Sequence, residues 1–246
     1  MTFQPPENNR EHEAVLDRFL DDHPQWQRWR TWSDETTHAV HESLCLRAEL
    51  VHEPKLEPRW RFAVYASPVG ARLWHAAAST TAPTDIIDAL LRSLATHAAE
   101  YPDMDSPRED EALAEATRPL ADSGWTTAPE APGWVRWRTP NDAFFLRHDR
   151  TADSSTDSSA AWVLSGLDQH RARWTIALSA TAPSIALADV AEAVADCEAF
   201  SRQQAAARSR ARNPTPPPGL TAGEPGRTRS PMHPLTGPNQ KRETTA

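Results

Sequence analysis

Two kinds of hydrophobic spacing alternate along the chain and divide most of it into two similar halves, residues 11–100 and 109–200. In each half, apolar residues first recur every three or four positions, which predicts a helix, and then every second position, which predicts strands. A second stretch of helical spacing closes each half. The predicted helices cover residues 11–21, 83–99, 109–121 and 183–200. The predicted strands cover residues 26–32, 40–51, 59–66 and 72–79 in the first half, and 133–139, 143–149, 161–166 and 171–179 in the second.

Sequence identities between the halves indicate an internal duplication. The stretch LWHAAASTTAP from Leu73 aligns with RWTIALSATAP from Arg173 at an offset of 100 residues. Two hexapeptides, WQRWRT from Trp26 and WVRWRT from Trp134, differ in one residue and lie 108 residues apart. A shared pattern with varied loop lengths is typical of duplicated domains. The sequence therefore predicts an α+β fold of two homologous αββββα units, each an antiparallel sheet covered by helices, packed as a pseudo-dimer.

The last 46 residues, 201–246, differ in composition from both halves. They are rich in Pro and Arg, and eight basic residues outnumber two acidic ones, whereas residues 1–200 carry a net charge of −14. We expect the last helix to extend to about residue 212 and the remainder to be disordered, because it lacks the apolar residues of a core.

The hexapeptides are the main candidate for a binding site. On strands, alternation places Trp26, Arg28 and Arg30 on one face, and likewise Trp134, Arg136 and Arg138, which would form ladders of arginine and tryptophan for an anionic or aromatic ligand. The alternative, which we favour, places Trp29 and Trp137 in the core and leaves the arginines as a solvated face. Trp74 and Trp174 begin alternating faces that we assign to the core.

No pattern in the sequence predicts catalysis, a metal site or a cofactor. The two cysteines, Cys45 and Cys197, form no recognisable framework, and alternation would send His38 and His41 to opposite faces. Motifs for nucleophilic hydrolases, zinc proteases and nucleotide-binding loops are absent from the sequence. No secretory signal or membrane-spanning run is visible, so we expect a cytoplasmic protein without a membrane partner.

Several stretches of the second half resemble a known family. They are PLADSGW (Pro119–Trp125), WRTPNDAFFLRHD (Trp137–Asp149), AWVLSG (Ala161–Gly166) and RWTIALSATAP (Arg173–Pro183). Together with the first half they resemble the actinobacterial domain-of-unknown-function family 317, of the streptomycete type, over about residues 15–200. The resemblance implies tandem copies of an α+β module in a cytoplasmic protein of accessory or mobile-element context. It implies no catalytic residues.

These observations favour a noncatalytic protein–protein interaction or regulatory module of accessory or mobile-element type, with a protein as its partner. The alternative is a nucleic-acid-associated protein that uses the Trp–Arg strands and the basic tail. The acidic charge of residues 1–200 opposes this alternative unless that charge is segregated on the surface. An enzyme of unknown class is the third candidate.

Overall fold

The computed structural model describes residues 7–30, 35–53, 56–96, 109–139, 142–152, 160–167 and 172–212. The predicted disordered tail beyond residue 212 and residues 97–108, between the two halves, lie outside the described residues. All ten strands, and the helices as far as Ala205, belong to one compact unit. Within the described part of the chain, no helix is both long and apolar enough to span a membrane.

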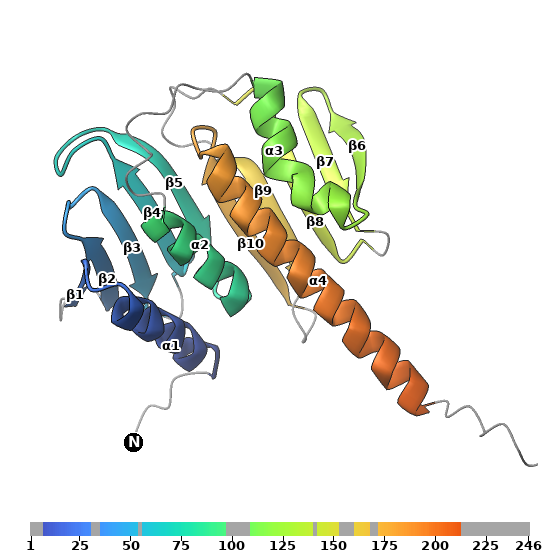
Figure 1. Ribbon diagram of the computed structural model, residues 1–246, viewed down its shortest axis with the longest axis horizontal. Coiled ribbons are helices and arrows are strands. Elements are labelled where there is room, and N and C mark those ends of the chain that lie inside the picture. Colours follow the sequence, from blue (N-terminus) through green and yellow to red (C-terminus); the bar gives the residue numbers. More distant parts are fainter. Residues whose placement is uncertain are drawn as a thin grey trace, which may run out of the picture. The chain divides into compact units, whose positions relative to one another are not determined.

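Fourteen elements follow the same order in the two halves, a helix, five strands and a helix (Figure 1). The first half contains α1 (Glu7–Asp22), β1 (Trp26–Arg30), β2 (Thr36–His41), β3 (Leu46–Val51), β4 (Trp60–Tyr65), β5 (Arg72–Ala78) and α2 (Thr84–Thr96). The second half contains α3 (Glu109–Asp122), β6 (Thr126–Ala131), β7 (Trp134–Arg138), β8 (Phe144–Asp149), β9 (Ala160–Leu167), β10 (Arg173–Ser179) and α4 (Ser184–Arg212).

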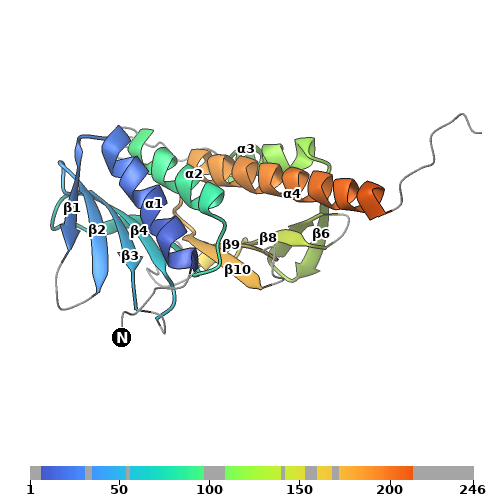
Figure 2. The same cartoon turned by 90° about the horizontal axis from the view of Figure 1, so that it is seen from below.

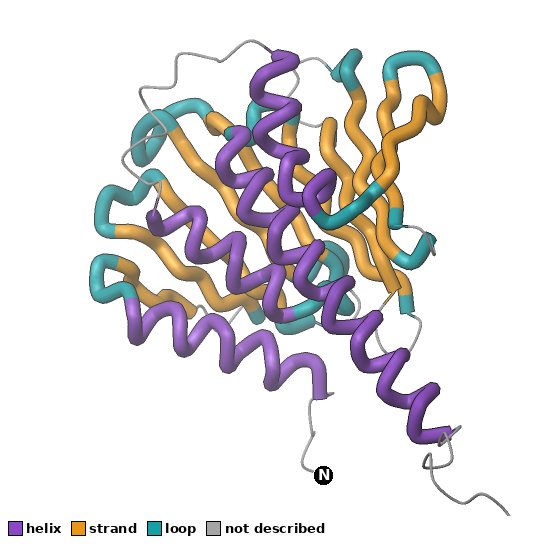
Figure 3. Tube along the Cα trace, turned by 45° about the vertical axis from the view of Figure 1, so that its right-hand side comes forward, coloured by secondary structure: helices purple, strands orange, loops and turns teal. Residues whose placement is uncertain are grey.

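The strands form one antiparallel sheet in the order β1-β2-β3-β4-β5-β10-β9-β8-β7-β6. Strands β5 and β10 pair at the centre, so each half continues the sheet of the other. The helices lie on one side of the strands, as Figures 2 and 3 show. The α+β class and the antiparallel pairing are therefore as predicted, but the strands form one continuous sheet instead of one sheet in each half.

The number of strands per half was predicted wrongly, as four instead of five. The predicted strand at 40–51 is the hairpin β2–β3, whose turn contains no glycine or proline; Leu44 instead adopts a left-handed backbone with φ of 62°. Strand β6 was missed because it is polar and contains Pro129. An edge strand tolerates proline, since one side of its backbone needs no partner. Strand β1 is described from Trp26 to Arg30, and residues 31 and 32 of the predicted strand lie outside the described residues.

The core lies between the sheet and the helices, and it is built on matching positions in the two halves. Trp74 and Trp174 are buried, as predicted, together with Trp60 and Trp162. A side chain at Gly166 of β9 would clash with Trp174 and Phe144, because a Cβ atom on this residue would lie 2.6 and 2.7 Å from their rings. The first half has valine and leucine, Val64 and Leu46, where the second has Gly166 and Phe144.

Reciprocal hydrogen bonds join the halves where β5 meets β10. The backbone N–H of Thr175 donates to the hydroxyl of Ser79 (3.0 Å), and that of His75 donates to the hydroxyl of Ser179 (3.1 Å). The hydroxyl of Thr81, just before α2, donates to the carbonyl of Arg173 (2.9 Å). The shared spacing of the LWHAAASTTAP segment and its counterpart thus places equivalent serines on both sides of one junction.

Candidate binding surface

One face of the sheet carries none of the described helices, and its side chains can be followed in register across the ten described strands. A single row of paired residues crosses this helix-free face, and its members in order are Trp29, His38, Glu49, Arg61, Ala77, Ala177, Val163, Arg147, Arg136 and Ala128. The row is symmetric about the β5–β10 junction. Arg147 therefore corresponds to Glu49, and Arg136 corresponds to His38.

Charge is segregated between the helix layer and this face. Helix α1 contains six acidic and two basic residues, and α3 contains five and one. On the strands, alternation and side-chain contacts place six arginines on the helix-free face, Arg47, Arg61, Arg136, Arg138, Arg147 and Arg173, against three acidic residues, Glu49, Glu130 and Asp149. The excess of acidic residues therefore lies on the helices, and the sheet face is basic.

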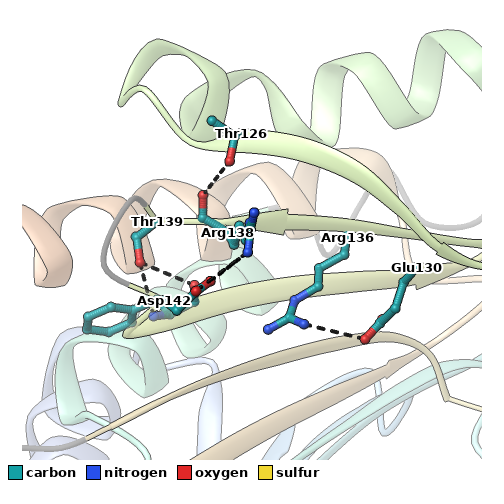
Figure 4. Close-up of polar contacts among 7 residues, drawn as sticks. Thr126, Glu130, Arg136, Arg138, Thr139 and Asp142 are labelled. Atoms are coloured by element: carbon teal, nitrogen blue, oxygen red, sulfur yellow. Dashed lines mark hydrogen bonds and ion pairs between the residues drawn. The ribbon is translucent and has the colours of Figure 1, made fainter.

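In the second half, two arginines of this face lie directly opposite each other on β7 and β8. Arg136 pairs in the ladder with Arg147. The carboxylate of Glu130 on β6 bridges them, with Oε1 3.5 Å from Nη1 of Arg136 and Oε2 2.6 Å from Nε of Arg147. The first of these contacts is drawn in Figure 4. One carboxylate between two guanidinium groups leaves one of the two positive charges uncompensated.

Both guanidinium groups also lie over aromatic rings. The Cζ atom of Arg136 is 4.7 Å from the ring centre of Phe145, and that of Arg147 is 4.6 Å from the ring centre of Trp134. Arg173 approaches Phe145 as well, at 5.8 Å. The side chains of Arg136 and Arg147 stay 31% and 36% exposed. Cation–π contacts of this kind hold a guanidinium in place without removing it from solvent. We call Trp134, Arg136, Phe145 and Arg147, with Glu130, the arginine–aromatic cluster.

The end of β7 is fixed by polar contacts that Figure 4 shows beside this cluster. Arg138 Nη1 lies 3.4 Å from Oδ1 of Asp142, and the hydroxyl of Thr126 lies 3.5 Å from the carbonyl of Arg138. The buried hydroxyl of Thr139 accepts from the N–H of Phe144 at 3.3 Å. At the opposite end of the β7–β8 pair, the carboxylate of Asp149 accepts hydrogen bonds from the N–H and the hydroxyl of Thr151. These bonds lower the pKa of its carboxyl group.

The helix-free face of the first half carries complementary charges instead. His38 lies 3.5 Å from Glu49, and Glu49 lies 3.9 Å from Arg61. Arg47 lies over the ring of Tyr65 at 4.9 Å. The row positions that hold two arginines in the second half thus hold a histidine and a glutamate in the first.

The two hexapeptides occupy different places in the fold. Strand β1 is the edge of the sheet, whereas β7 is the second strand from the opposite edge. Trp26, Arg28 and Arg30 share the face that α1 covers: Trp26 packs edge-on against Phe19, and Arg28 forms an ion pair with Asp17 of α1. The second set, Trp134, Arg136 and Arg138, lies on the helix-free face.

The predicted core position of Trp29 is therefore wrong, while that of Trp137 is confirmed. Trp29 is 59% exposed and lies on the helix-free face, whereas Trp26 is 4% and Trp137 is 5% exposed. The residue in register with Trp137 is Ala39 of β2. The repeated hexapeptide suggested an offset of 108 residues between the halves. The paired strands instead match at offsets of 98 to 102 residues, as between Glu49 and Arg147 or Trp60 and Trp162.

The buried titratable groups contribute to the core rather than to this face. The imidazole of His12 accepts a hydrogen bond from the indole of Trp60 at Nδ1 (2.9 Å), so its Nε2 carries the proton and donates to the carbonyl of Thr80 (3.2 Å). Burial lowers the pKa of His12 to about 4 and raises that of the Cys197 thiol to about 11. Among the described residues, no group of three metal-ligating side chains comes together.

The sequence pattern did not identify three members of the cluster, Arg147, Phe145 and Glu130, or the neighbouring Arg173. Arg147 and Phe145 alternate with buried residues in FFLRHD, so the alternation of β8 could have identified them. Glu130 lies on the strand that was not predicted.

Comparison with known proteins identifies one segment of the chain. Residues 42–100 match the family model described as SPDY, domain of unknown function (DUF317). The matched segment includes β3, β4, β5 and α2. It lies in the first half, whereas the stretches quoted above for the resemblance come from the second, so a tandem second copy and the streptomycete type stay predictions. No curated protein and no solved structure matches the chain.

Proposed function

We propose that the chain is a noncatalytic interaction module that binds an anionic macromolecule through the helix-free face of its sheet. The observation that carries this proposal is the segregation of charge, with arginines on the sheet face and carboxylates on the helices. A surface of one charge sign attracts and orients a partner of the opposite sign. An acidic protein surface and a nucleic acid both carry the required charge.

The spread of the arginines over several strands favours a macromolecule over a small substrate. Small-molecule sites are concave and bring a few polar groups together in an apolar cavity. Here the arginines are spread over neighbouring strands of a sheet and are partly solvated. The surface accordingly suits contacts with an extended partner.

We also propose that the halves are homologous units that pack as a pseudo-dimer. Support comes from the identical order of elements, from the symmetric row of paired residues, and from the reciprocal hydrogen bonds of Ser79 and Ser179. In a two-fold interface each contact occurs twice with the partners exchanged. On this view, the two helix-free faces arose from one ancestral surface and then diverged.

The experiment compares two triple variants of the full chain that change the charge equally. The face variant replaces Arg61, Arg136 and Arg147 with glutamine, and the helix variant replaces Arg18, Arg92 and Arg118 with glutamine. Binding of labelled polyglutamate and of a labelled oligothymidylate is measured by fluorescence anisotropy at low salt. We expect the face variant to lose binding and the helix variant to keep it. Equal losses in both variants, or no binding of either polyanion by the native chain, would contradict the proposal.

A further inference from the structure

We propose that the arginine–aromatic cluster of the second half is a binding site for single-stranded nucleic acid. The inference rests on the proposed function and names the partner of the same face. It concerns Trp134, Arg136, Phe145 and Arg147, which β7 and β8 place side by side.

The arrangement of the two arginines points to a ligand rather than to stability. Like charges directly opposite each other in an antiparallel ladder destabilise a sheet. Glu130 offsets one of the two charges, and its contacts with both guanidinium groups hold them close together. The first half, with the same ladder, has histidine opposite glutamate at this position. The second half therefore carries a repulsion that the fold itself does not require, and an anionic ligand would relieve it.

The stacking of the arginines favours a nucleic acid over an acidic protein. Unpaired bases stack on aromatic rings and on the planes of arginine guanidinium groups, and this recognition tolerates any sequence. Arg136 over Phe145 and Arg147 over Trp134 supply two such stacks, both still partly exposed. Acidic side chains have no aromatic face and would use the charge alone.

The stacked arginines and aromatic rings also favour a single strand over a duplex. In a duplex the base faces are occupied by neighbouring base pairs, so the stacks on β7 and β8 would find no partner. A single strand can place its bases on the sheet and its phosphates near Arg138 and Arg173, which lie on the same face as the cluster.

The segregation of charge removes the main objection to nucleic-acid binding. The acidic residues of α1 and α3 lie on the helix side of the sheet, and a polyanion that approaches the other face meets arginines first. Glu130 belongs to the cluster and Asp149 lies beside it, opposite Trp134 in the ladder, so we expect phosphates to avoid these two carboxylates.

The test uses a variant that keeps the charge and removes the stacking. In the full chain, Arg136→Lys with Arg147→Lys preserves both positive charges and replaces each planar guanidinium with an ammonium group. The matched control, Arg28→Lys with Arg30→Lys, changes the two arginines of the first hexapeptide, which lie on the helix-covered face. A third variant changes Arg227, Arg229, Lys241 and Arg242 of the tail to glutamine. Thermal melting of every variant checks that it folds.

The results that support the inference concern oligothymidylate affinity, its salt dependence and polyglutamate binding. The native chain binds a labelled oligothymidylate at low salt, the Arg136/Arg147 lysine variant binds it at least about fivefold more weakly, and the control keeps the native affinity. Replacing Arg136 and Arg147 with glutamine also lowers the slope of log affinity against log salt by about 0.7 per arginine. Binding of polyglutamate is unchanged in the lysine variant.

Other outcomes would overturn the inference in distinguishable ways. Binding of polyglutamate without binding of oligothymidylate would assign the face to an acidic protein and leave the proposed function standing. Oligothymidylate binding that the tail variant abolishes and the lysine variant leaves unchanged would place the contacts outside the cluster. Absence of binding to either polyanion would remove the inference and the proposed function together.

Discussion

The two halves of the sheet share one hydrogen-bonded framework and one core, but their helix-free faces differ. Trp60 and Trp162 are buried at matching positions, as are Trp74 and Trp174. On the other face, Arg147 of the second half occupies the position that Glu49 has in the first. Core positions are constrained by packing in both halves alike. Exposed strand positions are free of that constraint, and there the two halves differ in charge.

Removal of the paired core tryptophans should have the largest effect and the same effect in both halves. We expect Trp74→Ala and Trp174→Ala each to lower the free energy of unfolding by about 3–5 kcal/mol, because both rings are buried and their removal leaves a cavity. Urea denaturation measures this. A loss in only one variant would mean that the two cores are not equivalent.

The tryptophans of the hexapeptides should differ in the same measurement. Trp137→Ala should cost about 3–5 kcal/mol, since its ring is buried. Trp29→Ala should cost less than about 0.5 kcal/mol, because its side chain is mostly exposed. Similar losses in the two variants would contradict this difference in burial and would indicate that the two hexapeptides occupy equivalent positions.

Acid should lower the free energy of unfolding through His12 of the first half. Because burial lowers the pKa of His12 to about 4, below its ordinary value of 6.5, the unfolded chain takes up a proton at a higher pH than the folded chain does. Stability should therefore fall as the pH drops from about 6.5 towards 4, and this contribution should level off below 4, after a loss of at most about 3 kcal/mol. Urea midpoints at pH 7 and 5 should converge more closely in His12→Gln than in the native chain. An equal change in both proteins would assign the acid sensitivity to other groups.

A smaller effect should appear where the two cores are packed with different residues. Gly166→Val introduces the residue that the first half has at this position, Val64, and should cost about 1–3 kcal/mol through its clash with Trp174 and Phe144. Combining it with Phe144→Leu, which matches Leu46, should recover part of that loss. A double variant no more stable than the sum of the single effects would show that the two positions are uncoupled.

The sequence predicted the parts of the fold in which alternation and packing agree. Trp74 and Trp174 each lie on a strand in which every second residue from the tryptophan onward is apolar, and a helix follows. Their burial could therefore be predicted from the sequence alone. Strand β6 was not predicted because it contains a proline, and the turn at Leu44 was not predicted because it contains no glycine. The repeated hexapeptide suggested a wrong register between the two halves, because its two copies lie on strands with different neighbours in the sheet.

The candidate surface could be predicted only in part. Arg136, Arg138 and Trp134 were identified from their spacing, but Arg28 and Arg30 lie on the other face of the sheet. A strand pattern shows which residues share a face and not which face the helices cover. The pairing of Arg136 with Arg147 depends on the ladder between β7 and β8, and no local pattern in the sequence contains it.

The most direct test of the central claim is to follow the tryptophan indole resonances of the full chain by NMR during titration with oligothymidylate. Trp134 carries the stacked Arg147 on the helix-free face, whereas Trp26 is buried on the helix-covered face. We predict that the Trp134 resonance shifts on binding and that the Trp26 resonance stays in place. Saturable binding that leaves Trp134 unmoved would contradict the assignment of the second half's helix-free face as the binding surface.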